Sequence, residues 1–148
     1  MNASSRKIIR KVINNYLLSV IYEDDNVYGV NEILEMLLSV VIGYTVPLIK
    51  EHIDFFNNIL IPLHKVRTLY LFQISLLNCS ILFMIKDKIL PVNFCQGLLR
   101  YWPVGDSDKE IMFINEVNEV IGLCDMNLIE TIVIKLFKSV IIKELFDA

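Results

Sequence analysis

The sequence has few of the residues that carry chemistry. Of its 148 residues only two are histidines and three are cysteines, and its five glycines and four prolines are scattered along the chain. It has no Gly-rich phosphate loop, no Gly-x-Ser-x-Gly and no His-Glu-x-x-His. Because catalysis needs titratable groups that converge on one site, we expect no enzyme activity, no catalytic residue and no cofactor.

The cysteines and histidines are also too dispersed for a metal site. Cys79, Cys95 and Cys124 form no Cys-x-x-Cys pair, and their odd number indicates no disulfide framework, so we expect reduced thiols. His52 and His64 are separated by more than a metal-ligand spacing and are expected to lie on different elements. The N-terminal segment is basic, but charged residues interrupt its apolar residues too often for a secretory signal. Together with the reduced thiols, this favours a cytoplasmic or nuclear location.

Neither positively nor negatively charged residues are in large excess. Fourteen Lys and Arg stand against seventeen Asp and Glu, which gives a net charge of −3 and a pI near 5.4. A nucleic-acid partner would require a basic surface, so we expect none.

Hydrophobic residues, by contrast, are abundant. They make up 55% of the chain, charged residues make up 21%, and the mean hydropathy is +0.54. A folded chain of this length buries roughly 68–70% of the surface that its unfolded state exposes. Disorder is therefore excluded, and we expect residues 1–148 to form a single helical-repeat domain.

Gly, Pro and Asp or Asn residues divide the chain into seven segments whose apolar residues recur with a helical period. Pro47 stands where the third helix should begin, and Pro is favoured at a first helical position. Ser107-Asp-Lys-Glu110 is a capping box that should begin the sixth helix. The first five helices are predicted over about 5–22, 31–43, 47–60, 69–85 and 91–101.

The last two predicted helices carry apolar stripes. In the sixth we expect Phe113, Val117, Val120 and Cys124 to face inward and Asn115, Glu116, Asn118 and Glu119 to face outward. The stripe of the seventh comprises Leu128, Ile129, Ile132, Val133, Leu136, Phe137, Val140 and Ile141.

The predicted helices recur in pairs. The second, fourth and sixth begin near residues 31, 69 and 108, a period close to the ~40–47 residues of HEAT and armadillo repeats. We therefore expect an all-α, HEAT/armadillo-like helical-repeat solenoid of about seven helices, with three helix pairs and an unpaired N-terminal helix. Such a helix exposes an apolar stripe that a capping repeat normally covers, so the chain looks cut from something longer or paired with another protein there.

A small membrane protein is the alternative in a different class. Residues 68–85 are 18 consecutive uncharged residues, at the lower limit for a helix that spans a bilayer. A helix that is apolar on all sides also fits the inner layer of a solenoid, where it is sandwiched between other helices. Composition alone leaves both interpretations open.

Several strings along the chain are more specific than a helical period. They are Arg6-Lys-Ile-Ile-Arg-Lys-Val-Ile-Asn-Asn, Ile21-Tyr-Glu-Asp, Ile61-Pro-Leu-His-Lys-Val-Arg, Leu98-Leu-Arg-Tyr-Trp-Pro and Lys109-Glu-Ile-Met-Phe-Ile-Asn-Glu-Val. In order and spacing the chain resembles the B-prime regulatory subunits of protein phosphatase type 2A over about residues 6–137. The resemblance implies a HEAT-like solenoid without an active site, which joins the scaffold and catalytic subunits and selects substrates. It also implies that residues 68–85 form a buried repeat helix.

The resemblance further implies a groove for short Leu-x-x-Ile-x-Glu peptides. Its two aliphatic positions fall on Met36 and Val40, for which ordinary core packing is the alternative, and a following His falls on His52. The family's Lys position falls on Ile49, although Lys50 lies next to it. The repeat that forms the other groove wall would precede residue 1, and later repeats are also missing. A truncated solenoid that binds competitively without assembling a holoenzyme is therefore a second hypothesis.

Overall fold

Seven α-helices and three short helical turns follow one another in the computed structural model, which describes residues 2–23 and 27–147. No strand occurs within these residues, which confirms the all-α class predicted from the apolar periodicity. The elements are α1 (Ala3–Glu23), α2 (Val30–Val41), α3 (Lys50–Phe55), the π-helix η1 (Phe56–Leu60), the 3₁₀ turns η2 (Pro62–Lys65) and η3 (Leu69–Leu71), α4 (Gln73–Lys86), α5 (Leu90–Arg100), α6 (Ser107–Ile121) and α7 (Met126–Asp147).

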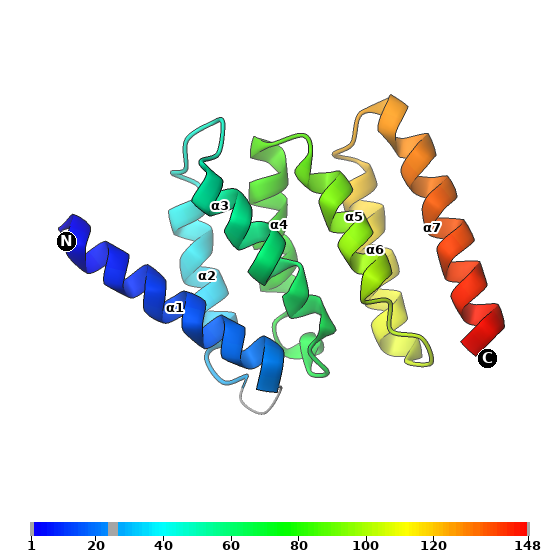
Figure 1. Ribbon diagram of the computed structural model, residues 1–148, viewed down its shortest axis with the longest axis horizontal. Helices are drawn as coiled ribbons and strands as arrows, with labels where there is room; N and C mark the ends of the chain where they lie inside the picture. The colour runs from blue at the N-terminus through cyan, green and yellow to red at the C-terminus, as the bar shows by residue number, and fades with distance from the viewer. Residues whose placement is uncertain (1, 24–26, 148) are drawn as a thin grey trace.

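The helices form two layers, with the two termini at opposite ends of the long axis (Figure 1). α1, α3, α5 and α7 follow one another in one layer, and α2, α4 and α6 lie behind them. Within the layers α2 packs on α4 and α5 packs on α7, while α5 also contacts α4 and α6 across the layers. This alternation is the architecture of a helical-repeat solenoid.

α1 is anchored at one end only. Its buried residues, Leu17, Val20 and Ile21, all lie in the C-terminal half, which packs on η1 and η2. In the N-terminal half, Ile8 and Val12 are more than 60% exposed. The N-terminal half of α1 extends past the start of α3 (Figure 1), so this half of the apolar stripe is not covered. A cleft lies between the two helices.

The third helix starts later than predicted. Pro47 does not open it, because Pro47 lies in the loop between α2 and α3. Ile49 is still extended, with φ −74° and ψ 160°, so the helix begins at Lys50. From Phe56 the backbone widens into the π-helix, in which the Ile61 N–H donates to the Phe56 carbonyl at 3.1 Å. Such π-helical turns are rare and are often found at functional sites.

Residues 69–85 do not form the single helix that was predicted. Phe72, with φ −137° and ψ 13°, breaks the chain between η3 and α4, and α4 starts only at Gln73. The 14 residues of α4 bury Leu76, Cys79 and Phe83 between neighbouring elements. In the described part of the chain, none of the helices combines the length and the apolar character that a bilayer span requires.

The start of α6 differs from the prediction by one residue. Asp106, rather than Ser107, is the N-cap, and its carboxylate accepts a hydrogen bond from the Lys109 N–H at 3.2 Å. Glu110 accepts from the Gly105 N–H at 3.2 Å. The predicted capping box is therefore not formed as such: the N-cap half is provided by the Asp106 carboxylate, and Glu110 binds the N–H of the residue before the N-cap instead of the N-cap N–H.

Glu116 was predicted to face outward from α6, and this is wrong. Its side chain is completely buried and pairs with the completely buried His64. Phe113, Val117 and Val120 face inward as predicted, and Asn115, Asn118 and Glu119 are exposed. Cys124 lies beyond the end of the helix and is partly buried.

The prediction assigned too many residues to the buried face of α7. Leu136 is buried and Val133 and Val140 are partly buried, but Phe137 and Ile141 are 65% and 53% exposed. The difference arises because α7, at the end of the described layer, packs mainly on α5 and so covers only a narrow face. The side chains of Leu128, Ile129 and Ile132 lie outside the described residues.

A continuous row of rings connects the repeats through the core. Phe83 of α4 contacts Phe56 of η1 with ring centroids 5.8 Å apart, and Phe56 contacts Phe94 of α5 at 6.3 Å. His64 of η2 meets Phe94 and Phe113 edge-on, at 5.2 Å and 6.0 Å. Offset and edge-to-face contacts of this kind stabilise a core beyond the area they bury, so the row holds one repeat against the next.

Candidate functional site

A cleft of about 750 Å³ lies between α1 and α3 and is here called the α1–α3 cleft. α1 contributes a cationic wall, and α3 with the start of η1 contributes the opposite wall, while Leu37 and Tyr44 close the end near α2. The principal lining residues are Lys7, Arg10, Lys11, Ile13, Asn14 and Leu18 of α1, and Glu51, His52, Asp54, Phe55, Asn58 and Ile59 of the opposite wall.

His52 is held in the cleft by stacking. Its ring lies parallel to the Tyr44 ring, with centroids 3.6 Å apart and an interplanar angle of 4°. Tyr44 is in turn fixed by an edge contact with Phe83 and by Lys86, whose Nζ donates to the Tyr44 carbonyl at 2.7 Å. The Nδ1 atom of His52 is buried and makes no hydrogen bond with any described residue. Stacking thus fixes the orientation of the imidazole in the cleft.

The charge state of His52 follows from its surroundings. Burial lowers its pKa, and the neighbouring Arg10 guanidinium lowers it further, against the opposing influence of Glu51. Burial also disfavours the charged form of Tyr44, and because that form is the deprotonated one, the pKa of Tyr44 is raised. Because an unperturbed His already titrates near pH 6.5, the lowered pKa favours the neutral form of His52 at pH 7.

The other residues assigned by resemblance lie outside the cleft lining. Met36 and Val40 share one face of α2 and are 47% and 49% exposed, so core packing does not account for them. The buried face of α2 is formed by other residues, among them Leu37, which lines the cleft. Lys50 is exposed at the first position of α3, and its neighbour Ile49 is 47% exposed. The structure thus places His52 in the cleft and leaves Met36, Val40 and Lys50 on the adjoining surface.

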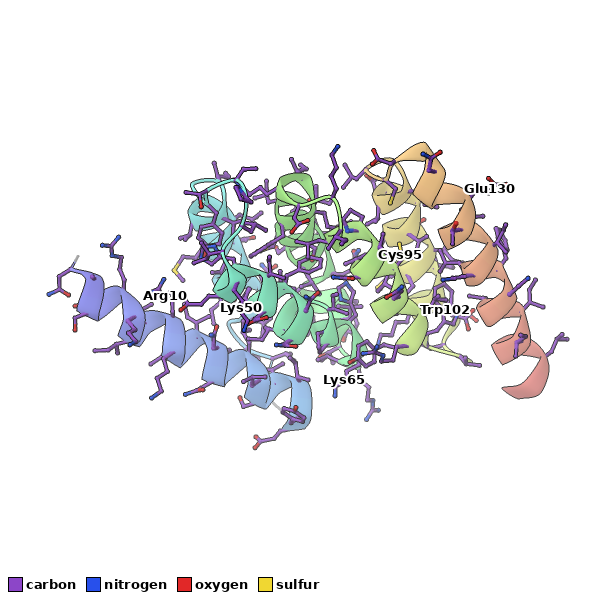
Figure 2. The ribbon with its side chains drawn as sticks, turned by 45° about the horizontal axis from the view of Figure 1, so that its top comes forward. Arg10, Lys50, Lys65, Cys95, Trp102 and Glu130 are labelled. Atoms are coloured by element: carbon purple, nitrogen blue, oxygen red, sulfur yellow. The ribbon has the colours of Figure 1, made fainter. Side chains whose placement is uncertain are left out.

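The cationic wall on α1 was not anticipated from the sequence. The resemblance placed the other side of the groove before residue 1, whereas Lys7, Arg10 and Lys11 supply positive charge from within the described chain. Figure 2 shows Arg10 on the side of α1 that faces α3. The sequence did contain a signal for this wall, namely the spacing of one helix face shared by Lys7, Lys11, Asn14 and Leu18.

Charge is distributed unevenly across the α1–α3 cleft. Three cations lie on the α1 side, and two carboxylates, Glu51 and Asp54, lie on the α3 side. Between them, Leu37 and Phe55 provide apolar surface. A carboxylate on a ligand is therefore attracted to the α1 wall, while aliphatic side chains fit the apolar surface. Within the described residues, no cluster of His, Cys, Asp or Glu is arranged to hold a metal ion.

Comparisons with known proteins agree with this architecture. The family model for the protein phosphatase 2A regulatory B subunit (B56 family) matches residues 2–143. Over 117 residues the chain is 47% identical to the serine/threonine-protein phosphatase 2A 56 kDa regulatory subunit delta isoform of Saccharomyces cerevisiae, covering 79% of this chain and 16% of that protein. Over 135 residues it is 39% identical to the human alpha isoform, covering 91% and 28%.

The relative from Caenorhabditis elegans, the protein phosphatase 2A regulatory subunit pptr-1, is 39% identical over 134 residues, or 90% of this chain and 25% of that protein. The chain thus spans between 16% and 28% of the length of these three relatives. The match of the family model covers nearly all of the sequence. The chain therefore belongs to the B56 family of protein phosphatase 2A regulatory B subunits.

Proposed function

We propose that this chain is a non-catalytic regulatory subunit of protein phosphatase 2A, which binds the scaffold and catalytic subunits and directs dephosphorylation. The observation that supports this most strongly is membership of the B56 family over residues 2–143, whose relatives are named as regulatory subunits.

Substrate selection, in this proposal, takes place at the α1–α3 cleft and the adjoining face of α2. The peptide is a short Leu-x-x-Ile-x-Glu segment, the motif that the family resemblance implies. Its Glu pairs with the cationic α1 wall around Arg10 and accepts a hydrogen bond from His52. Its aliphatic side chains contact the half-exposed Met36 and Val40. The leucine and glutamate of the motif are about 17 Å apart in an extended chain, so in this proposal the peptide lies extended between α2 and α1.

Assembly is tested by size-exclusion chromatography of the detergent-free protein, alone and mixed with the scaffold and catalytic subunits. We expect a ternary peak that contains all three proteins. A folded monomer that elutes separately from both subunits would contradict the proposed subunit role. If that monomer still bound the peptide, it would act as a competitive module instead.

Peptide recognition is tested separately, by fluorescence anisotropy with a labelled Leu-x-x-Ile-x-Glu peptide. Val40→Asp should abolish binding, because it places a carboxylate where an aliphatic side chain docks. Ile111→Asp is the matched control, since Ile111 is also about half exposed but lies on α6, away from the cleft. Circular dichroism must show that both variants are folded. Equal binding by both variants would refute the assignment of Val40.

A further inference from the structure

A second cleft, of about 320 Å³, lies between η1 and α5. Most of its rim consists of side-chain amides, and it is here called the amide cleft. Its floor is made where Ile61 meets Gly97, and the two come so close that a Cβ added to Gly97 would lie 2.2 Å from Cγ2 of Ile61. This contact brings the two helical segments together at the floor. The rim residues are Asn57, Asn58, Asn93, Gln96, Arg100 and Tyr101.

The rim can hydrogen-bond a peptide main chain. Asn93 donates from Nδ2 to Oδ1 of Asn57 at 3.4 Å, while the amides of Asn58 and Gln96 make no hydrogen bond to any other described residue. Both of these side chains are exposed. Each carboxamide offers two N–H donors and one carbonyl acceptor, the same groups that an extended main chain needs to satisfy. Such a rim suits a peptide irrespective of its sequence.

The amide cleft continues the α1–α3 cleft. Asn58 lines both hollows, because the π-helix η1 that carries it forms one wall of each. Arg100, at the last position of α5, is exposed and has no carboxylate partner among the described residues. A chain leaving the α1–α3 cleft past Asn58 therefore meets amides first, with a cation beside them.

We propose that the amide cleft binds the main chain of the segment flanking the peptide held in the α1–α3 cleft, and that an acidic side chain of this segment pairs with Arg100. The inference rests on the proposed function, because it needs the first cleft to hold a peptide. It adds a subsite that favours long, acidic flanking segments over short motifs.

The test compares a short and two long synthetic peptides by fluorescence anisotropy. The short peptide has eight residues and contains only the Leu-x-x-Ile-x-Glu motif. Each long peptide adds eight Ser and Glu residues, about 26 Å when extended, at one end of the motif. We expect one of the long peptides to bind about five- to tenfold more tightly, the effect of one or two hydrogen bonds.

Variants of the amide cleft test whether the additional affinity of the long peptide arises there. Gln96→Met and Arg100→Gln should each weaken binding of the long peptide by about two- to fivefold, the loss expected when one amide hydrogen bond or one ion pair is removed. Binding of the short peptide, which depends on the α1–α3 cleft, should not change. Asn118→Met is the matched control, since Asn118 is also an exposed amide but lies on α6.

Each outcome distinguishes the two proposals. If the short peptide binds but neither extension adds affinity, or if the gain survives both variants, the amide cleft is not a subsite and the proposed function stands. If no peptide binds, both proposals fail. If only a long peptide binds and Gln96→Met abolishes that binding, the amide cleft is a peptide site and the motif groove assigned to the first cleft is wrong.

Discussion

The Nε2 atom of His64 lies 3.0 Å from Oε2 of Glu116, and both side chains are completely buried. On the other side of the ring, Nδ1 lies 3.0 Å from the carbonyl oxygens of Leu60 and Ile61. Carbonyl and carboxylate oxygens around both ring nitrogens favour the protonated form of His64, and the Glu116 carboxylate lies at ion-pair distance. Glu116 also accepts from Nε2 of Gln73 at 3.1 Å. The buried ion pair thus joins η2, α4 and α6.

Removing one partner should be costly. Glu116→Ala leaves the imidazolium of His64 buried without a counter-charge, and we expect it to lower the free energy of unfolding by about 3–5 kcal/mol. Urea denaturation followed by circular dichroism measures this value. Glu119→Ala is the control, because Glu119 is exposed on the same helix and its loss should change stability by less than about 0.5 kcal/mol. Similar values for the two variants would show that the ion pair does not stabilise the fold.

The same pair makes stability depend on pH. Burial by itself would lower the pKa of His64, but the Glu116 carboxylate and the carbonyls of Ile61 and Leu60 outweigh it and raise the pKa above its ordinary value. A raised folded-state pKa stabilises the protein fully below the unfolded-state pKa, about 6.5, and the stabilisation is lost as the pH rises through the folded-state value.

We therefore expect the stability difference between the wild-type chain and His64→Gln to be largest near pH 6 and to shrink toward alkaline pH. Urea unfolding of both proteins at intervals between pH 6 and pH 10 measures it. Using the difference removes the contribution of His52, whose pKa is shifted the opposite way. A difference that grows with pH would contradict the assignment of a buried imidazolium.

Gly97→Ala should destabilise the contact between α5 and η1. The new Cβ would lie 2.2 Å from Cγ2 of the buried Ile61, and overpacking costs about 1–3 kcal/mol, more than the gain of up to about 1 kcal/mol in helix propensity. Gly122→Ala is the control, because its nearest neighbour would be 3.5 Å away. In the double variant with Ile61→Ala the penalty of Gly97→Ala should disappear in urea unfolding. A penalty that persists there would mean that the clash lies elsewhere.

Peptide affinity should depend more on Arg10 than on His52. Arg10 faces the cleft as a full charge, so Arg10→Ala should weaken binding of the Leu-x-x-Ile-x-Glu peptide by roughly 1.5–3 kcal/mol. The neutral His52 contributes one hydrogen bond to a charged group, and His52→Ala should cost about 1 kcal/mol or more. Isothermal titration calorimetry measures both, with Lys88→Ala as an exposed control. Unchanged affinity in Arg10→Ala would remove α1 from the site.

The local pattern predicted some parts of the fold and missed others for identifiable reasons. The spacing of Phe113, Val117 and Val120 correctly gave the buried face of α6. Glu116 lies on that same face by its position, but its charge suggested exposure. Only a partner far away in the chain makes burial of a carboxylate favourable, and a helical period contains no information about such a partner.

The candidate site, too, was predicted from the sequence only in part. His52 was assigned from the family strings alone, and the structure places it in the α1–α3 cleft beside Tyr44. The role of Arg10 depends on the angle at which α1 lies across α3, and that angle follows from which half of α1 is buried. The break at Phe72 and the π-helix after Phe55 were also missed, because each is a backbone adjustment to neighbouring elements.

The amino-acid sequence by itself determined that this protein is an all-helical member of the B56 family, because apolar periodicity, helix caps and family strings are read from residues close together in the chain. Tertiary structure decided that His64 and Glu116 form a buried ion pair, that α1 supplies the cationic wall of the cleft, and that Asn58 connects two hollows. These features depend on contacts between distant segments, and the burial, charge state and exposure of a side chain are set by what packs against it.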